Sequence, residues 1–172
     1  SLLHLQPDIA VITNIDNDHL SFYDSNQEKL NQSFVSFAEN LPFYGHILLN
    51  LDDSNIRKIS KDIHRRQITF GFNSKNRFQI TDAKLENGLQ KFQLTDHSNK
   101  KYYKFSTNLS GRHNLYNVTA AICVAIEEKI SVKDIAKGLA DFRGVGRRFE
   151  LSKIYFSKRP HVLIDDYGHH PA

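Results

Sequence analysis

The sequence predicts an α/β protein in which a mostly parallel sheet is flanked by helices and carries a small attached antiparallel sheet. Between residues 9 and 72, apolar runs alternate with amphipathic segments. The order strand, helix, strand, helix, strand is typical of parallel α/β sheets. Further along, strand-like segments are joined by Asn87-Gly88, which is a strong signal for a β-hairpin.

The parallel part is predicted from apolar runs that lie between helix-capping signals. Its strands are expected at Ile9–Ile12, His46–Leu51 and Gln67–Phe72. The first run is continuously apolar, as expected for a strand that is buried on both faces. Ser25 or Asn26 is expected to cap the first helix, which Pro42 ends, and Asp53 or Ser54 to cap the second.

The middle of the chain is predicted to contain antiparallel strands followed by helices. The strands are expected at Phe78–Glu86, Leu89–Asp96 and Lys101–Ser106. A helix is expected over Asn114–Lys129, because apolar residues recur there at helical spacing. Ser131 and Asp134 form a capping pattern for a further helix.

The last part of the sequence is predicted to begin a separate domain. Two glycines make Arg143–Arg147 a candidate hinge, and Glu150–Phe156 and Val162–Asp166 are expected to be strands. We expect the apolar run Val162–Ile164 to be a buried strand. Two acids and two histidines follow it, and such residues are costly to place there unless they contact a ligand.

The composition excludes several classes of protein. Among 172 residues, 40% are hydrophobic and 24% charged, and no apolar run approaches the roughly 20 residues that span a membrane. We therefore expect no membrane partner, and the presence of only one cysteine fits a protein of the reducing cytoplasm. The net charge of +4 is mild and the basic residues are dispersed, so nucleic acid is not an expected partner. The single cysteine, Cys123, excludes an internal disulfide and is expected in the core.

Two groups of polar residues stand where α/β proteins bind ligands. Asp18 and His19 follow the first strand, and such side chains suit a divalent cation near phosphates. His113 and Asn117 share one face at the start of the longest helix, where unpaired N–H groups attract phosphate or a polar heterocycle. The alternatives are an ordinary polar turn for the first group, and capping by Asn114 with solvated neighbours for the second.

Two later groups lie at the hinge and after the last strand. Arg147 and Arg148 could bring guanidinium groups to a phosphate when domains close, although an ordinary basic linker is equally consistent with them. Asp166, His169 and His170 follow the last strand and would be a weak metal signal by themselves.

Five motifs follow one another in a particular order. They are Thr13-Asn14-Ile15-x-x-Asp18-His19, Asn40-Leu41-Pro42-Phe43-Tyr44-Gly45, Gly111-Arg112-His113-Asn114-x-x-Asn117, Gly144-Val145-Gly146-Arg147-Arg148-Phe149 and Asp165-Asp166-Tyr167-Gly168-His169-His170-Pro171. Together they resemble the Mur ligase family. The resemblance covers essentially the whole chain and is weakest at about residues 73–105.

The resemblance implies a position within a larger protein. Mur ligases have an N-terminal UDP-binding domain, a central ATPase domain and a C-terminal Rossmann-like domain. Residues 1–146 resemble most of the central ATP-binding domain, and residues 147–172 resemble the start of the C-terminal domain. The pattern G-x-x-x-x-G-K-[ST] does not occur here. We therefore expect the missing N- and C-terminal domains of the same chain to be partners, and this piece alone to be inactive.

The resemblance also implies a reaction, the ATP-dependent ligation of L-alanine to UDP-N-acetylmuramate in peptidoglycan precursor synthesis. The muramate carboxylate attacks the γ-phosphate of ATP and becomes an acyl phosphate, and the amino group of L-alanine then displaces phosphate. This chemistry needs Mg²⁺ and other cations to shield converging anions, and closure to exclude water.

Roles for single residues follow from the same resemblance. His19 is implied to bind Mg²⁺, with Asn14 and Asp18 shaping its loop. The residues implied to bind ATP are His113, Asn114 and Asn117 on the adenine side, Arg148 at the phosphates, and Asp166 at the ribose or the interdomain seam. The residues implied to be catalytic are Arg148, together with His169 and His170, which would face the acyl phosphate and the incoming amino acid.

Three other interpretations stay open from the sequence. The first is the recycling ligase that attaches a tripeptide to UDP-muramate, although the sequences of Gly144–Phe149 and Tyr167–His170 favour the alanine-adding enzyme. The second is a non-catalytic nucleotide-binding module that lacks the phosphate loop, and the third is an α/β domain without a ligand. Upstream sequence containing Gly-Lys-Thr would favour the enzyme.

Overall fold

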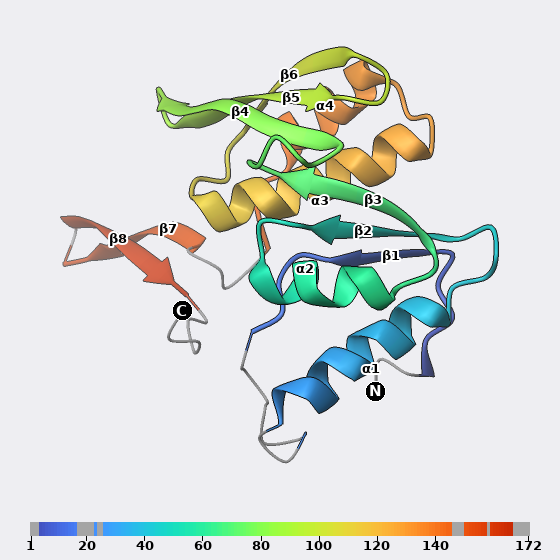
Figure 1. Ribbon diagram of the computed structural model, residues 1–172. Helices are drawn as coiled ribbons and strands as arrows, with labels where there is room; N and C mark the ends of the chain where they lie inside the picture. Colours follow the sequence, from blue (N-terminus) through green and yellow to red (C-terminus); the bar gives the residue numbers. More distant parts are fainter. Residues whose placement is uncertain (1–3, 17–22, 24–25, 146–149, 158, 167–172) are drawn as a thin grey trace.

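The computed structural model describes residues 4–16, 23, 26–145, 150–157 and 159–166 of the chain. Its main feature is a six-stranded sheet in which the strands follow the order of the sequence (Figure 1). The strands are β1 (Ile9–Ile12), β2 (His46–Asn50), β3 (Arg66–Gly71), β4 (Phe78–Glu86), β5 (Leu89–Asp96) and β6 (Lys101–Thr107).

The sheet changes from parallel to antiparallel at β4. Strands β1 to β4 pair in parallel, but β3 and β4 share only Phe70↔Phe78 and Gly71↔Gln79. β5 and β6 then add antiparallel strands. Asn87 and Gly88 have φ values of 51° and 78°, as a two-residue hairpin turn requires. The predicted fold class is confirmed, and the antiparallel strands continue the same sheet through this short parallel join.

Helices cover both faces of the sheet. They are α1 (Gln27–Glu39), α2 (Ser54–Ile59), which continues into the 3₁₀ turn η3 (Ser60–Asp62), α3 (Arg112–Glu127) and α4 (Val132–Asp141). In β2, Ile47 and Leu49 pack with α1 and α2, whereas Leu48 packs with α3 and α4, because successive strand side chains point to opposite faces. No helix in the described parts of the chain is long and apolar enough to cross a membrane.

The capping predictions are resolved in favour of one residue each. Asn26 caps α1, and its side chain accepts hydrogen bonds from two backbone N–H groups. Asp53 caps α2 in the same way, and the Ser131 side chain caps α4 by accepting from one backbone N–H group, that of Asp134. For α3 the cap is Gly111, which offers no side-chain acceptor. The idea that Asn114 caps this helix is therefore wrong, since Asn114 lies inside the first turn.

An ion-pair network ties the antiparallel strands to the end of α3. Arg77 donates to Asp96 at 3.3 Å and lies 2.8 Å from a carboxylate oxygen of Glu127, which also meets Arg66 at 2.6 Å. The Asp96 side chain is 0% exposed. Burial alone would raise the pKa of Asp96, but hydrogen bonds from Arg77, Asn99 and Ser98 lower it. The network therefore holds a buried carboxylate in its charged form.

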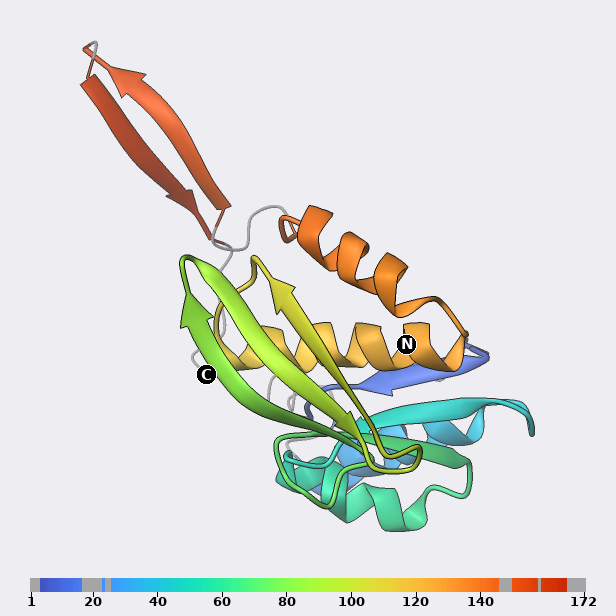
Figure 2. The same ribbon diagram turned by 90° about the horizontal axis from the view of Figure 1, so that it is seen from above.

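Strands β7 (Glu150–Phe156) and β8 (Arg159–Asp165) form a separate antiparallel hairpin. It extends away from the six-stranded sheet (Figure 2). The expectation that Val162–Ile164 is buried is wrong, because these side chains are 66%, 48% and 52% exposed. A two-stranded sheet buries apolar side chains only where another layer covers it, and no covering layer is present among the described residues.

Candidate functional site

The candidate site lies where the parallel strands end. The loops after β1, β2 and β3 leave the sheet at its carboxyl edge, which is where open α/β sheets bind ligands. The first turns of α3 lie at the same edge, because the Tyr116 hydroxyl donates to Asp52 at 3.0 Å and its ring meets Phe72 at 5.5 Å between centroids. Three loops and one helix start therefore surround one region.

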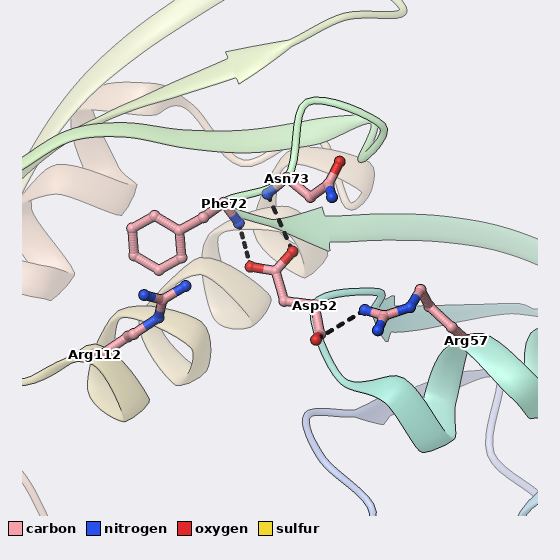
Figure 3. Close-up of a pocket in the computed structure, with 5 residues that line it drawn as sticks. All are labelled: Asp52, Arg57, Phe72, Asn73 and Arg112. Carbon is pink, nitrogen blue, oxygen red and sulfur yellow. Dashed lines mark hydrogen bonds between the residues drawn. The ribbon is translucent and has the colours of Figure 1, made fainter.

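A pocket of about 360 Å³ opens in this region (Figure 3). Asp52, Arg57, Phe72, Asn73 and Arg112 line it. Arg57 donates to the carbonyl oxygens of Leu51 and Asp52 at 2.6 and 2.9 Å. Two guanidinium groups, one carboxylate, an aromatic ring and an amide thus share the pocket, and its formal charge of about +1 favours a ligand with negative charge.

The Asp52 carboxylate is the centre of the hydrogen bonding. Its Oδ2 accepts from Phe72 N at 2.6 Å and from the Tyr116 hydroxyl at 3.0 Å. Its Oδ1 accepts from Asn73 N at 3.1 Å and from Asn76 Nδ2 at 3.2 Å. All four partners are donors, so the position requires a group that only accepts. Asp52 thereby joins the end of β2 to the loop after β3 and to α3.

Gly71 allows this close approach. It ends β3 with φ +148°, and a Cβ placed there would lie 2.6 Å from Asp52 Oδ1. Any larger residue would push the carboxylate away from the loop that it holds.

Arg112 lies over the ring of Phe72 on the α3 side of the pocket. Its guanidinium carbon is 4.4 Å from the ring centroid, and its Nε donates to the Tyr116 hydroxyl at 3.1 Å. This hydrogen bond raises the pKa of Arg112. Burial raises the pKa of Tyr116, and the hydrogen bond to Asp52 raises it further. Tyr116 therefore stays protonated. Its hydroxyl links the two charged groups, because it accepts a hydrogen bond from Arg112 and donates one to Asp52.

The start of α3 provides further polar groups. Because Gly111 has no side chain, the first-turn N–H groups of this 16-residue helix receive no side-chain cap and carry partial positive charge. His113 and Asn117 are exposed and lie on one face, since they are four residues apart. A planar heterocycle could meet their imidazole and amide groups, while anionic groups would be favoured by the helix terminus and the two arginines.

The structure brings some of the predicted site residues together. His113, Asn114 and Asn117 all lie in the first two turns of α3, and Asn114 donates to the carbonyl oxygen of Ser110 at 2.7 Å. Asp166 is exposed directly after β8. None of the hydrogen bonds or ion pairs between described residues joins Asp166 to α3, so the two groups are not brought together by such contacts.

Four predicted site residues, His19, Arg148, His169 and His170, lie outside the described residues, as does Asp18. Within the described ranges, no group of three or more His, Cys, Asp or Glu residues could hold a metal ion.

Sequence reasoning missed Asp52, Phe72 and Arg57. It assigned the capping of α2 to Asp53 or Ser54, which the structure resolves in favour of Asp53, and it gave Asp52 no role. The available signal was the position of Asp52 just after a buried parallel strand. Polar residues at that edge of a sheet commonly face ligands or neighbouring loops. Arg112 stood in a motif but had no predicted role.

Comparison with known proteins shows the family and the fold. The family described as the Mur ligase middle domain matches residues 1–125. The chain belongs to the Mur ligase family. Its fold is similar to that of the UDP-N-acetylmuramate-alanine ligase MurC from Thermotoga maritima, with a TM-score of 0.79 and 23% identity over 98% of this chain and 36% of the other. At that identity, the likeness shows the shared fold.

Two curated Mur ligases match the whole length of the chain. The UDP-N-acetylmuramate–L-alanine ligase of Wigglesworthia glossinidia brevipalpis is 42% identical over 100% of this chain and 38% of its own length. The enzyme of the same name from Vesicomyosocius okutanii subsp. Calyptogena okutanii (strain HA) is 41% identical over 99% of this chain and 37% of its own length. The chain thus spans less than two fifths of these relatives.

Proposed function

We propose that the chain is the ATP-binding part of a ligase that joins L-alanine to UDP-N-acetylmuramate. The observation that carries the proposal is the meeting of α3 with the carboxyl edge of β2 and β3, where the Gly111–Asn117 motif lies beside a pocket with two arginines. Relatives that are 41–42% identical and bear the name of this reaction support the choice of substrates. We further propose residues 1–146 as the ATP-binding domain and residues 147–172 as the start of a following one.

In this proposal, α3 binds the nucleotide. His113 and Asn117 contact the adenine edge, because imidazole and amide groups supply both donors and acceptors. Asn114 fixes the entry to the helix through Ser110. The uncapped N–H groups and Arg112 favour the negative charge that follows the base.

Residues of the loops and of the last segment complete the site in this proposal. His19 is the proposed metal ligand, and Mg²⁺ bound there would shield the phosphate charges from the muramate carboxylate. Arg148 contacts the phosphates after closure, and Asp166 meets the ribose or the seam between domains. His169 and His170 face the acyl phosphate and the amino group of L-alanine that displaces phosphate from it.

The test is phosphate release by the longest natural chain that carries these residues, with ATP, Mg²⁺, UDP-N-acetylmuramate and L-alanine. We expect release that depends on all four components, and none from the 172-residue piece. Replacing L-alanine with a tripeptide distinguishes the recycling ligase. ATP binding without phosphate release by the longest chain would favour a nucleotide-binding module instead.

A further inference from the structure

Arg112 is an exposed side chain of the pocket that is nevertheless held in one orientation (Figure 3). Its guanidinium carbon lies 4.4 Å from the centroid of the Phe72 ring and 5.9 Å from that of the Tyr116 ring. Its Nε donates to the Tyr116 hydroxyl at 3.1 Å. An exposed arginine samples many rotamers, and a ligand that binds it must first order them. Here the ring and the hydroxyl order the side chain before any ligand binds.

The hydrogen bond between Arg112 and Tyr116 can run in only one direction. The Asp52 carboxylate accepts from the Tyr116 hydroxyl at 3.0 Å, so the single proton of that hydroxyl points to Asp52. The hydroxyl oxygen is then left to accept, and an arginine Nε, which only donates, is its matching partner. Asp52 itself is fixed by the backbone N–H groups of Phe72 and Asn73. The orientation of Arg112 is therefore set from the end of β2 outwards.

The terminal Nη groups of Arg112 stay available for a ligand. Among the described residues, none of the hydrogen bonds uses them, and none of the ion pairs includes Arg112. The Tyr116 hydroxyl lies between Arg112 and Asp52, and the carboxylate accepts its four hydrogen bonds from uncharged donors. The positive charge of Arg112 is thus not paired directly with a carboxylate.

We propose that Arg112 binds the anionic part of the nucleotide, and that Tyr116 and Phe72 are positioning residues that hold it ready. This rests on the proposed function, in which the neighbouring His113 and, on the next turn of α3, Asn117 contact the base. A guanidinium can bind a phosphate group through two parallel hydrogen bonds from its planar fork. Tyr116 and Phe72 contribute without touching the ligand, because they act through the arginine.

Three substitutions separate binding from positioning. Arg112→Gln removes the charge, whereas Arg112→Lys keeps the charge but loses the planar fork and the stacking on Phe72. Tyr116→Phe removes the hydroxyl and keeps the ring that packs against Phe72 at 5.5 Å between centroids. The matched control is Tyr103→Phe, the same change at a half-buried tyrosine of β6 that packs on Phe105 and does not line the pocket.

The experiment measures the dissociation constants of ADP and of adenosine for the longest natural chain without Mg²⁺, since adenosine carries the base but no phosphate. Arg112→Gln should weaken ADP binding about ten-fold and adenosine binding by less than about two-fold. Arg112→Lys and Tyr116→Phe should each weaken ADP binding about three- to five-fold and spare adenosine in the same way. Tyr103→Phe should leave both constants within about two-fold of the wild type.

The double variant Arg112→Gln/Tyr116→Phe tests whether Tyr116 acts through the arginine. It should bind ADP as Arg112→Gln does, within about two-fold, because the hydroxyl then has no guanidinium left to position. Losses that add in the double variant would overturn the positioning role of Tyr116. Equal losses of ADP and adenosine binding in Arg112→Gln, or no loss of either, would overturn the role of Arg112.

A second readout needs no ligand. In ¹⁵N relaxation spectra, the Nε–H group of Arg112 should be ordered in the wild type and in Tyr103→Phe, and mobile in Tyr116→Phe. Equal order in the two variants would contradict the positioning. A wild type that binds neither adenosine nor ADP nor ATP would overturn the proposed function together with this role of Arg112, whereas binding that is the same in the wild type and all variants would overturn this inference alone.

Discussion

Replacing Gly71 with alanine tests the packing that holds Asp52 in place. The added Cβ would lie 2.6 Å from Asp52 Oδ1, 2.7 Å from its Cγ and 2.9 Å from Asn76 Nδ2. Cβ atoms do not approach other atoms below 3.0 Å, so the carboxylate must shift away. It would then lose contact with the backbone N–H groups that begin the loop after β3.

Two effects contribute to the expected loss of stability. A side chain at φ +148° strains the backbone by about 1–3 kcal/mol. Displacing the carboxylate weakens at least one charged hydrogen bond, which costs about 1.5–3 kcal/mol. We therefore expect the free energy of unfolding to fall by about 2.5–6 kcal/mol in Gly71→Ala.

Urea denaturation followed by circular dichroism measures this change, and Gly88→Ala is the control. Gly88 also has a positive φ, +78°, but nothing lies within 4 Å of a Cβ placed there. Its substitution should cost only the backbone strain, about 1–2 kcal/mol. If Gly71→Ala loses no more stability than Gly88→Ala, the close approach to Asp52 contributes nothing and the reasoning is refuted.

Three other predictions concern the ion network, a buried histidine and the two residues that we propose to contact Mg²⁺ and the phosphates. Arg77→Leu should lower the free energy of unfolding by about 3 kcal/mol in the same assay, because it leaves Asp96 buried without its guanidinium partner. If Arg77→Leu lowers it no more than the replacement of an exposed arginine by leucine does, this prediction is contradicted. Burial lowers the pKa of His46 from its usual 6.5, so the unfolded chain binds the proton first, and stability should fall as the pH drops below about 6.5, by up to about 1.4 kcal/mol per pH unit. His46→Leu should reduce the dependence of the free energy of unfolding on pH, measured by urea denaturation at several pH values. The same dependence in His46→Leu and wild type would contradict this role of His46. In the longest natural chain, His19→Ala should raise the Mg²⁺ requirement and Arg148→Ala should lower kcat for phosphate release; unchanged kinetics in either variant removes that assignment.

The fold was largely predictable because its signals are local. The hairpin at Asn87-Gly88 follows from two residues that tolerate positive φ, and the cap at Ser131 from a four-residue pattern. Helix α3 begins two residues before its predicted start, because Gly111 and not a polar side chain caps it. The exposure of Val162–Ile164 was not predictable, since burial of an apolar run depends on what covers it.

The site was only partly predictable because its contacts join distant parts of the chain. The motif at the start of α3 predicted that His113 and Asn117 share one face of a helix, and both lie in the first two turns of α3; their contact with a nucleotide stays a prediction. Asp52, however, draws its partners from positions 20 to 64 residues further along, and no local pattern records such pairs. In sequence, Asp52 is one of two adjacent acids before a helix, and only the packing of β3 and α3 distinguishes it from Asp53.

The most direct test of the account is where a nucleotide binds. We suggest titrating the ¹⁵N-labelled chain with Mg²⁺ and a non-hydrolysable ATP analogue and following the amide signals. Saturable changes should concentrate at Gly111–Asn117 and at Phe72–Asn73, and His113→Ala should weaken them. Changes confined to other surfaces, or none at millimolar nucleotide, would contradict a nucleotide site at this edge of the sheet.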